Sequence, residues 1–265
     1  MTSAGIRLFS VLALGLALAA PTGAALHQQT VDYRQGETTL EGYLAYEDTF
    51  AGLRPAVLVY HHWRGIDQYI KARTDQLARM GYIAFAADVY GKGVRPADAK
   101  AAAAQAQIYR SDRQLMRRRA QTALDTLRLV PRVDGRRIAA IGYCFGGGVA
   151  LELARSGADI AGVVSFHGTL DTPRPEDAKL IKAKILILQG ADDPNAPIKQ
   201  IAEFEDEMRG GKVDYQIALY GGAVHSFTMP SAGSAPSTGN AYDAKADRRS
   251  WQVMKDFFAE VFGPK

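Results

Sequence analysis

The sequence predicts an α/β fold: a mostly parallel central sheet with helices on both faces, preceded by an antiparallel hairpin. Two observations support this. Residues 30–46 alternate between polar and apolar side chains around Gly36, which is typical of a hairpin. Further along, short apolar runs rich in Val, Ile and Ala alternate with longer segments that carry apolar residues at helical spacing. Buried strands that alternate with helices indicate a parallel sheet covered on both faces.

The first 25 residues have the pattern of a secretory signal peptide. Arg7 precedes an apolar run from Leu8 to Ala20, and small residues at positions 23 and 25 suit cleavage after Ala25. The run is shorter than the roughly 20 residues that a membrane-spanning helix needs. We therefore expect an exported chain, periplasmic or secreted, without stable membrane association after cleavage. An uncleaved membrane anchor is the alternative.

Residues 26–265 are predicted to form one domain, because single hydrophobic cores stop growing near about 250 to 300 residues. Residues 230–240, rich in Ser, Gly, Ala and Pro, are predicted to be a mobile loop. After the hairpin, strands are predicted at 55–62, 82–90, 136–144, 160–168, 184–190 and 213–222. Helices are predicted at 66–80, 97–109, 112–129, 146–155, 197–209 and 241–262.

Composition argues against several classes of protein. The net charge is +4, and the basic run Arg117–Arg119 lies in a predicted helix without interleaved aromatic residues, so we expect a solvated helix face and no nucleic-acid partner. A single cysteine cannot form an internal disulfide. The sequence has no phosphate-binding loop and no set of His and acidic residues at metal-ligand spacing. We therefore expect no metal and no cofactor.

That cysteine, Cys144, lies in the segment AAIGYCFGGGVALELA, residues 139–154. An apolar strand turns there directly into a helix, and Gly142, Gly146 and Gly147 permit the sharp turn because they lack a Cβ atom. The residue at the corner then projects outward, as in the nucleophile elbow of hydrolases. The alternative is a buried structural cysteine at a glycine-rich helix start.

Two more candidate residues follow separate predicted strands. The segment GADDPNAP, residues 190–197, presents Asp192 and Asp193 at the start of a loop, where aspartates are also common as turn residues. His225 follows the last predicted strand in YGGAVHSF, residues 220–227. Ligands gather at the carboxyl ends of such strands. The order nucleophile, acid, histidine is the order that the α/β-hydrolase architecture requires.

These segments resemble the motif blocks of the dienelactone hydrolase family, and the resemblance covers nearly the whole mature chain. It implies an α/β-hydrolase fold in which Cys144 is the nucleophile, His225 its base and Asp193 the acid that orients the imidazole. The family pattern Gly-x-x-Asp-x-x-x-Pro favours Asp193 and leaves Asp192 as a turn residue. The matching segments are residues 142–147, 190–197 and 225–227.

The chemistry suits these residue types. A thiolate is the reactive form of cysteine, and a helix N-terminus beside a histidine lowers the thiol pKa. The oxyanion of a tetrahedral intermediate needs two N–H donors. The elbow supplies one from Phe145, and the resemblance implies that Trp63, in the loop HHWRGID, supplies the other.

The sequence departs from the founding members of the family at three positions. They hold the resting cysteine unreactive with a glutamate, and His62 stands at that position here. His61 and His62 could instead cap the strand end or bind a water. The founding members also clamp the substrate carboxylate with two arginines, where this chain carries Lys92 and Met229. Bidentate carboxylate recognition needs an arginine fork, so dienelactone itself is not the expected substrate; Arg64 is a candidate replacement.

Aromatic side chains are predicted near the site and suggest an apolar or aromatic acyl pocket, although ordinary core packing is the alternative for each. The expected activity is hydrolysis of a small carboxylic ester or lactone through a thioester intermediate, with a small molecule as the partner. A thiol redox or peroxidatic protein using Cys144 and a non-catalytic binding protein are the alternatives. The pocket candidates are Trp63, Tyr90, Phe145 and Phe227, together with His62, Arg64 and Lys92.

Overall fold

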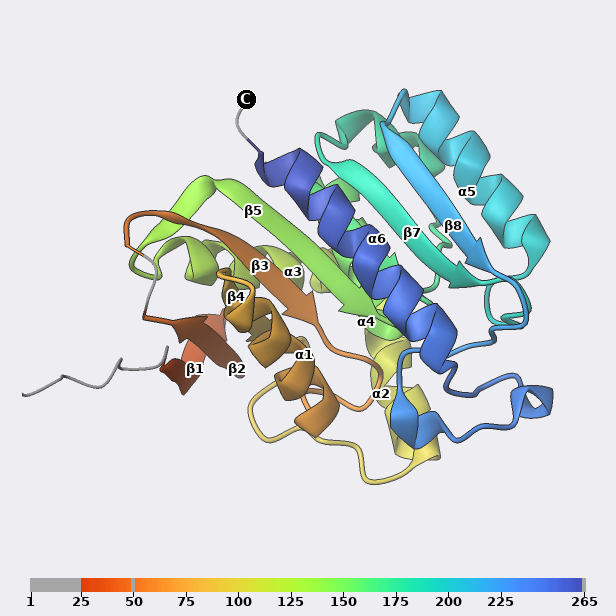
Figure 1. Cartoon of the computed structure of the whole chain (residues 1–265), viewed down its shortest axis with the longest axis horizontal. Helices are drawn as coiled ribbons and strands as arrows, with labels where there is room; N and C mark the ends of the chain where they lie inside the picture. Colours follow the sequence, from red (N-terminus) through yellow and green to blue (C-terminus); the bar gives the residue numbers. More distant parts are fainter. Residues whose placement is uncertain (1–24, 49–50, 264–265) are drawn as a thin grey trace, which may run out of the picture.

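The computed structural model describes residues 25–48 and 51–263. The predicted signal peptide therefore lies, except for Ala25, outside the described residues. An eight-stranded sheet in the order β1-β2-β4-β3-β5-β6-β7-β8 forms the centre of the described part (Figure 1). The predicted α/β fold class, with its mostly parallel sheet and N-terminal hairpin, is confirmed.

The hairpin consists of β1 (Leu26–Gln35) and β2 (Thr38–Glu47), paired antiparallel, and β2 pairs antiparallel with β4 (Ile83–Ala87). Gly36 makes the turn with a positive φ of 56°. The strand β1 begins four residues before the predicted hairpin. Residues 28–30 are polar and exposed, so they lack the alternation by which the rest of the strand was predicted.

The parallel part of the sheet consists of six strands: β3 (Arg54–Tyr60), β4, β5 (Val133–Tyr143), β6 (Gly162–Phe166), β7 (Lys184–Gly190) and β8 (Tyr215–Tyr220). The central strands are almost wholly buried, as expected for a sheet covered on both faces. Because these strands run parallel, their carboxyl ends meet at one edge of the sheet.

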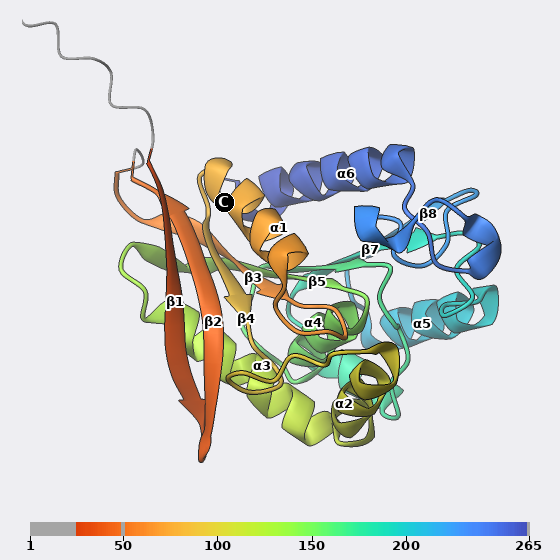
Figure 2. The same cartoon turned by 90° about the horizontal axis from the view of Figure 1, so that it is seen from below.

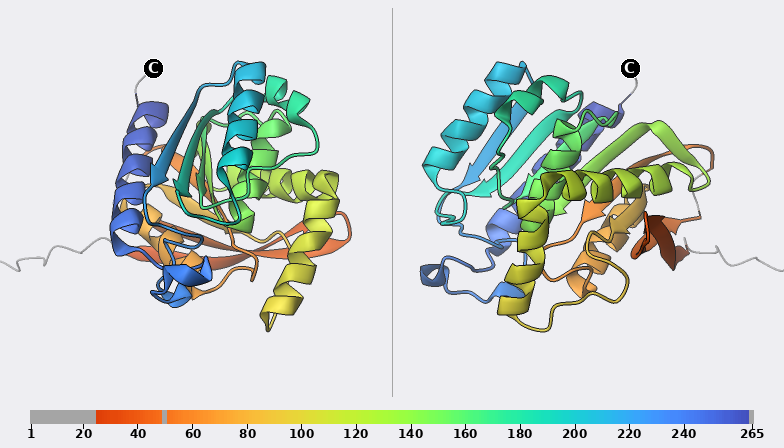
Figure 3. Two further views of the ribbon diagram at one scale, coloured as in Figure 1. Left: turned by 90° about the vertical axis from the view of Figure 1, so that its right-hand side faces the viewer. Right: turned by 180° about the vertical axis from the view of Figure 1, so that it is seen from behind.

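Helices cover both faces of the sheet (Figure 2). On one face, α1 (Gln68–Arg79) and α6 (Ala244–Phe262) share an apolar cluster with the strands. On the other face, α2 (Ala99–Ser111), α3 (Arg113–Arg128), α4 (Phe145–Arg155) and α5 (Ile198–Gly211) share a second cluster. Figure 3 shows α2 beside α3, and the hairpin at one edge of the sheet.

Local sequence sets the helix starts. Asp98 accepts a hydrogen bond from the Ala101 N–H at the start of α2, and Asp112 accepts one from Leu115 at the start of α3. Such caps satisfy N–H groups that have no partner within the helix. Asp112 also ends α2, which explains why the two helices are separated by a single residue.

Two expectations need correction or refinement. The basic run is not a wholly solvated face: Arg117 and Arg119 are buried, and Arg117 forms ion pairs with Glu152 and Asp177. A charge run cannot reveal carboxylates that a neighbouring element supplies. Within residues 230–240 the chain forms two short 3-10 helices, η2 (Pro230–Ala232) and η3 (Pro236–Thr238). A third, η1 (Pro175–Leu180), precedes β7.

Candidate active site

Cys144 lies at the sharp turn between β5 and α4, as the glycine pattern predicts. Its backbone has φ 55° and ψ −118°, a conformation that residues other than glycine rarely adopt. Its N–H donates to the Phe166 carbonyl at 3.0 Å. A Cβ on Gly142 would lie 1.9 Å from the Gly146 oxygen, and one on Gly146 would lie 2.2 Å from the Tyr60 oxygen. Only glycine therefore fits where β5, β3 and α4 approach one another.

The structure brings Cys144, His225 and Asp193 together from three separate loops. The Cys144 Sγ lies 3.1 Å from Nε2 of His225, and Nδ1 of the same ring lies 2.9 Å from Oδ2 of Asp193. All three residues are at least nine-tenths buried, Cys144 being 8% exposed. Both imidazole nitrogens are thus engaged, one by sulfur and one by a carboxylate.

The electrostatics favour a thiolate and an imidazolium. Burial alone raises the pKa of the Cys144 thiol, but His225 and the Phe145 N–H outweigh burial, and the pKa falls below its usual value. Burial opposes protonation of His225, yet the adjacent Cys144 and Asp193 raise its pKa to about 10. The two shifts have one cause, the attraction between the charged forms of neighbouring groups.

Asp193, and not Asp192, lies against the histidine. Its Oδ2 also accepts from the Gln189 side-chain amide at 2.6 Å, and its Oδ1 accepts from the Asn195 N–H at 2.8 Å. Asp192 is exposed and accepts from the Gly222 N–H at 3.1 Å. The structure therefore separates the two neighbouring aspartates into a buried partner of His225 and a turn residue.

Of the two predicted N–H donors, that of Phe145 contacts the sulfur, whereas Trp63 lines the same cavity as Cys144. Phe145 is the first residue of α4, and its N–H contributes to the lowered thiol pKa. Trp63 lies in the loop after β3, and no acceptor for its N–H occurs within the part of the chain that the structure describes. The Trp63 carbonyl accepts from the Tyr90 hydroxyl at 2.9 Å, which holds the next peptide of this loop, between Trp63 and Arg64.

A cavity of about 710 Å³ opens at Cys144 and His225. Trp63, His62 and Arg64 line it, as predicted, and so does Met229. Its other lining residues come from the N-cap of α1, from α2 and from the loops after β6, β7 and β8: Asp67, Arg110, Thr169, Asn195, Ser226, Ser231, Ala232 and Asn240.

His62 uses both ring nitrogens within its own loop. Its Nδ1 accepts from the Arg64 N–H at 3.1 Å, so its Nε2 carries the proton and donates to Asp67 Oδ2 at 2.9 Å. The other oxygen of Asp67 caps α1 by accepting from the Ile70 N–H. His62 thus lies at the cavity wall and connects the Trp63 loop to α1.

Four predicted pocket residues are not part of the cavity lining. Phe145 is buried, and its ring packs against that of Tyr90. Lys92 is about half exposed and pairs with Asp32 and Glu41, because its loop runs beside the hairpin. Tyr90 is buried against the Phe145 ring and supports the Trp63 loop. Phe227 is fully buried and packs on His167. For Tyr90 and Phe227 the alternative of core packing is the one that the structure favours.

Arg110 is the main residue of the cavity that the sequence did not reveal. It lies in the last turn of α2, and its Nε is buried without a hydrogen-bond partner among the described residues. Its positive charge lowers the pKa of Cys144. Arginines are common in the last turn of surface helices, where they interact favourably with the helix dipole. The sequence therefore gave no reason to place Arg110 at the cavity.

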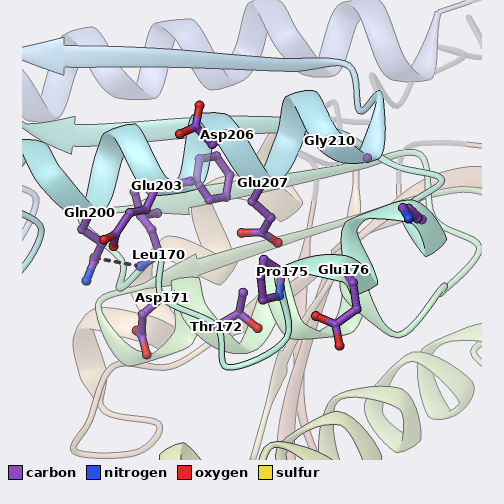
Figure 4. Close-up of a pocket in the computed structure, with 13 residues that line it drawn as sticks. Leu170, Asp171, Thr172, Pro175, Glu176, Gln200, Glu203, Asp206, Glu207 and Gly210 are labelled. Carbon is purple, nitrogen blue, oxygen red and sulfur yellow. Dashed lines mark hydrogen bonds between the residues drawn. The ribbon is translucent and has the colours of Figure 1, made fainter.

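A second groove, of about 570 Å³, lies between α5 and the segment that follows β6 (Figure 4). Acidic side chains dominate its lining, among them Asp171, Glu203 and Glu207, and Gln200 accepts from the Leu170 N–H at 3.2 Å. It contains neither Cys144 nor His225. Across residues 25–48 and 51–263, no three His, Cys, Asp or Glu side chains form a group that could hold a metal ion. None of the described helices is both long and apolar enough to span a membrane.

The sheet order, the turn at Cys144 and the histidine after the last strand define an α/β hydrolase. Comparison with known proteins identifies the family. The model of the dienelactone hydrolase family matches residues 40–262. The chain therefore belongs to the dienelactone hydrolase family, and it is a hydrolase of the ester and lactone class.

Individual relatives agree with this assignment. The crystal structure of a dienelactone hydrolase-like promiscuous phosphotriesterase, P91, from metagenomic libraries is 42% identical, with a TM-score of 0.84 over 89% of this chain and 99% of that chain. A Bradyrhizobium protein, named a probable 2-oxo-3-(5-oxofuran-2-ylidene)propanoate lactonase, is 31% identical over 72% of this chain and 80% of its own. A Yersinia pestis protein, provisionally named carboxymethylenebutenolidase, is 28% identical over 88% and 90%.

Proposed function

We propose that the chain hydrolyses a small carboxylic ester or lactone by nucleophilic attack of Cys144 and a thioester intermediate. The observation that carries the proposal is the hydrogen-bonded chain from the Cys144 Sγ through His225 to Asp193, with distances of 3.1 and 2.9 Å. Cys144 and His225 line a cavity that is large enough for a small ester. Hydrolysis then requires an acylation step and a deacylation step.

In acylation, the Cys144 thiolate attacks the carbonyl carbon and forms a C–S bond, while the carbonyl π electrons move to oxygen. The N–H groups of Phe145 and Trp63 stabilise this oxyanion, and one such donor lowers the barrier by about 3 kcal/mol. The C–O bond to the alcohol then breaks, and the His225 imidazolium gives its proton to the departing alkoxide.

In deacylation, water attacks the thioester carbonyl and His225 accepts its proton. The C–S bond breaks, which restores the thiolate and releases the acid. Asp193 accepts from Nδ1 throughout, so Nε2 always faces the sulfur and the reacting oxygen. An amide is a poorer substrate, because a thiolate leaves the tetrahedral intermediate more readily than an amide nitrogen does.

The charge of the cavity supports an ester that carries an anionic group. Arg64 and Arg110 both line it, and neither forms an ion pair with a described residue. Arg64 stacks over the Trp63 ring at 5.7 Å, and Asp67, the acid in the lining, is already bound to His62. Lys92, which sequence reasoning assigned to this role, lies elsewhere.

The mechanism is tested with Cys144→Ala and His225→Ala on p-nitrophenyl acetate. We expect each variant to lose at least about a thousandfold in kcat/KM while keeping the circular dichroism and thermal midpoint of a folded protein. Undiminished hydrolysis by Cys144→Ala would refute the mechanism. Thiol-dependent consumption of peroxide without ester cleavage would instead support the peroxidatic alternative, and tight ligand binding without turnover would support a binding protein.

The preference for anionic esters is tested with matched esters that carry or lack a free carboxylate. Arg110→Ala should raise KM for the anionic ester about tenfold or more and leave KM for the neutral ester nearly unchanged, whereas a rise in the thiol pKa of Cys144 would change kcat for both esters alike. Lys92→Ala is the matched control and should change neither. Equal loss on both esters in Arg110→Ala would show that this arginine does not recognise charge.

The relative P91 adds a second candidate activity, because it is described as a promiscuous phosphotriesterase and is 42% identical. Attack of the Cys144 thiolate on phosphorus would form a P–S bond and expel an aryloxide, and water would then break the P–S bond. Release of p-nitrophenol from a p-nitrophenyl phosphotriester, absent in Cys144→Ala, would support this second activity.

A further inference from the structure

The loop that carries His225 is held by a set of buried contacts centred on Thr228. His225 itself lies outside the regular strands: its N–H donates to the Gly239 carbonyl, and its carbonyl accepts from Ala241. Ser226, the next residue, has a positive φ of 58°. Such a turn is strained and persists only where its surroundings hold it.

Thr228 is fully buried and meets three other side chains. Its Oγ1 lies 2.6 Å from the Tyr69 hydroxyl of α1 and 2.7 Å from Nε2 of His167, at the end of β6. Its carbonyl accepts from Arg73, one turn further along α1, at 2.9 Å. Asp247 of α6 holds the same guanidinium at 2.5 Å.

The protons in this cluster have a consistent direction. Arg73 Nε donates to the Tyr69 oxygen, so the Tyr69 proton is free to go to Thr228 and the Thr228 proton to Nε2 of His167. This direction gives each hydroxyl proton an acceptor and places the ring proton of His167 on Nδ1, which is buried without a hydrogen-bond partner among the described residues. His167 then accepts at Nε2 and remains neutral. Burial, followed by the charge of His225, lowers the pKa of His167 well below its ordinary value, which agrees with a neutral ring.

His167 contacts the base directly. Its ring packs edge-on against His225, with centroids 5.3 Å apart, and against Phe227 at 5.2 Å. A neutral, fixed ring at this place limits rotation of His225 without adding a second positive charge beside the imidazolium.

We infer that Thr228 and His167 are positioning residues: together with Tyr69 they form a clasp that keeps Nε2 of His225 within reach of the Cys144 sulfur. None of the three touches the reacting atoms. The inference rests on the proposed function, since positioning matters only where His225 reacts with Cys144. A displacement of about 1 Å at such a site costs up to about a hundredfold in rate.

The central test is Thr228→Val, which removes the hydroxyl and keeps the shape, beside Thr228→Ser, which keeps the hydroxyl. We expect Thr228→Val to lower kcat for p-nitrophenyl acetate by about 10- to 100-fold, and Thr228→Ser to remain within about threefold of wild type. Tyr69→Phe should resemble Thr228→Val. The double variant should be no worse than the poorer single variant, because both substitutions remove one shared hydrogen bond.

Thr74→Val is the matched control. Thr74 is also fully buried and lies on α1, but its hydroxyl donates to the Ile70 carbonyl of its own helix. It should lose some thermal stability and keep wild-type kcat. Should Thr228→Val fold poorly, Tyr69→Phe and Thr228→Ser carry the comparison.

A second readout does not depend on ester hydrolysis: the pH dependence of iodoacetamide alkylation of Cys144. In Thr228→Val the apparent thiol pKa should move up towards its ordinary value, because the imidazolium no longer lies beside the sulfur; in Thr74→Val it should not move. An unshifted thiol pKa together with a kcat within about twofold of wild type in Thr228→Val would overturn the clasp. If Cys144→Ala kept full esterase activity, the proposed function would fail, while the alkylation profile would still decide the clasp.

Discussion

Replacing Asp193 with asparagine tests whether its carboxylate fixes the tautomer and the charge of His225. Oδ2 of Asp193 accepts from both His225 Nδ1 and the Gln189 amide, and Oδ1 accepts from Asn195. Asparagine supplies one oxygen and one NH2 group. If the oxygen stays with Asn195, the NH2 group faces two donors.

The protein can relieve that conflict at the expense of catalysis. Gln189 Oε1 has no partner among the described residues, so this amide can turn over and accept from the new NH2 group. His225 can relieve its own conflict by carrying its proton on Nε2 and accepting at Nδ1. The variant should therefore fold, with an imidazole that points a proton at the sulfur.

The magnitude follows from the lost charge. At an effective dielectric constant of about 20, opposite unit charges 2.9 Å apart attract by about 6 kcal/mol. Since about 1.4 kcal/mol corresponds to a factor of ten, an upper estimate of the loss is roughly four powers of ten in rate. We expect Asp193→Asn to lower kcat for p-nitrophenyl acetate by about 10³- to 10⁴-fold.

Asp192→Asn is the matched control. Its carboxylate is exposed and accepts a single backbone N–H, so this variant should stay within about twofold of wild type in kcat and within about 0.5 kcal/mol in stability. Stopped-flow release of p-nitrophenol measures both variants. Equal losses in the two variants, or a loss below about tenfold in Asp193→Asn, would refute the tautomer argument.

Three other outcomes follow from the structure and a fourth from the sequence. Because the thiol pKa of Cys144 is lowered and that of His225 is raised to about 10, ester hydrolysis should rise with pH through the thiol pKa and fall again as the pH passes about 10, where the imidazolium proton is lost. Iodoacetamide should inactivate the enzyme without substrate and should not slow above pH 10; a thiol that resists until substrate is added would show that the family's resting switch survives in another form. Gly142→Ala should cost at least about 3 kcal/mol in urea unfolding, since its Cβ would lie 1.9 Å from a backbone oxygen, whereas Gly210→Ala, with open space around it, should be neutral or stabilising. Protein recovered from its native host should begin near Leu26, and an N-terminus at Met1 would contradict the predicted signal peptide.

Much of the fold could be predicted from the sequence because the patterns that indicate strands, helices and turns are local. Apolar runs and the hairpin glycine each act over a few residues, so the succession of strands and helices along the chain could be predicted. The turn at Cys144 was readable for the same reason: glycines at fixed offsets are required wherever a strand turns sharply into a helix. The choice between Asp192 and Asp193 came from the family pattern, and the structure brings Asp193 to His225.

The residues around this centre were less predictable, since their roles depend on which elements meet. Lys92 lies in the expected loop but turns to the hairpin, where Asp32 and Glu41 attract it. Arg110 reaches the cavity from the last turn of α2, and Arg117 is buried against carboxylates of α4 and η1.

The sequence alone determined that a thiol, an acid and a histidine follow three strands of a parallel sheet in the order of an α/β hydrolase. It could do so because parallel strands end at one edge, which converts order along the chain into proximity. Only the tertiary structure decided which charged side chains line the cavity and which residues hold His225 in position. Arg110, Thr228, Tyr69 and His167 come from elements distant in sequence, and only packing brings a guanidinium, two hydroxyls and a neutral imidazole to bear on His225 and Cys144.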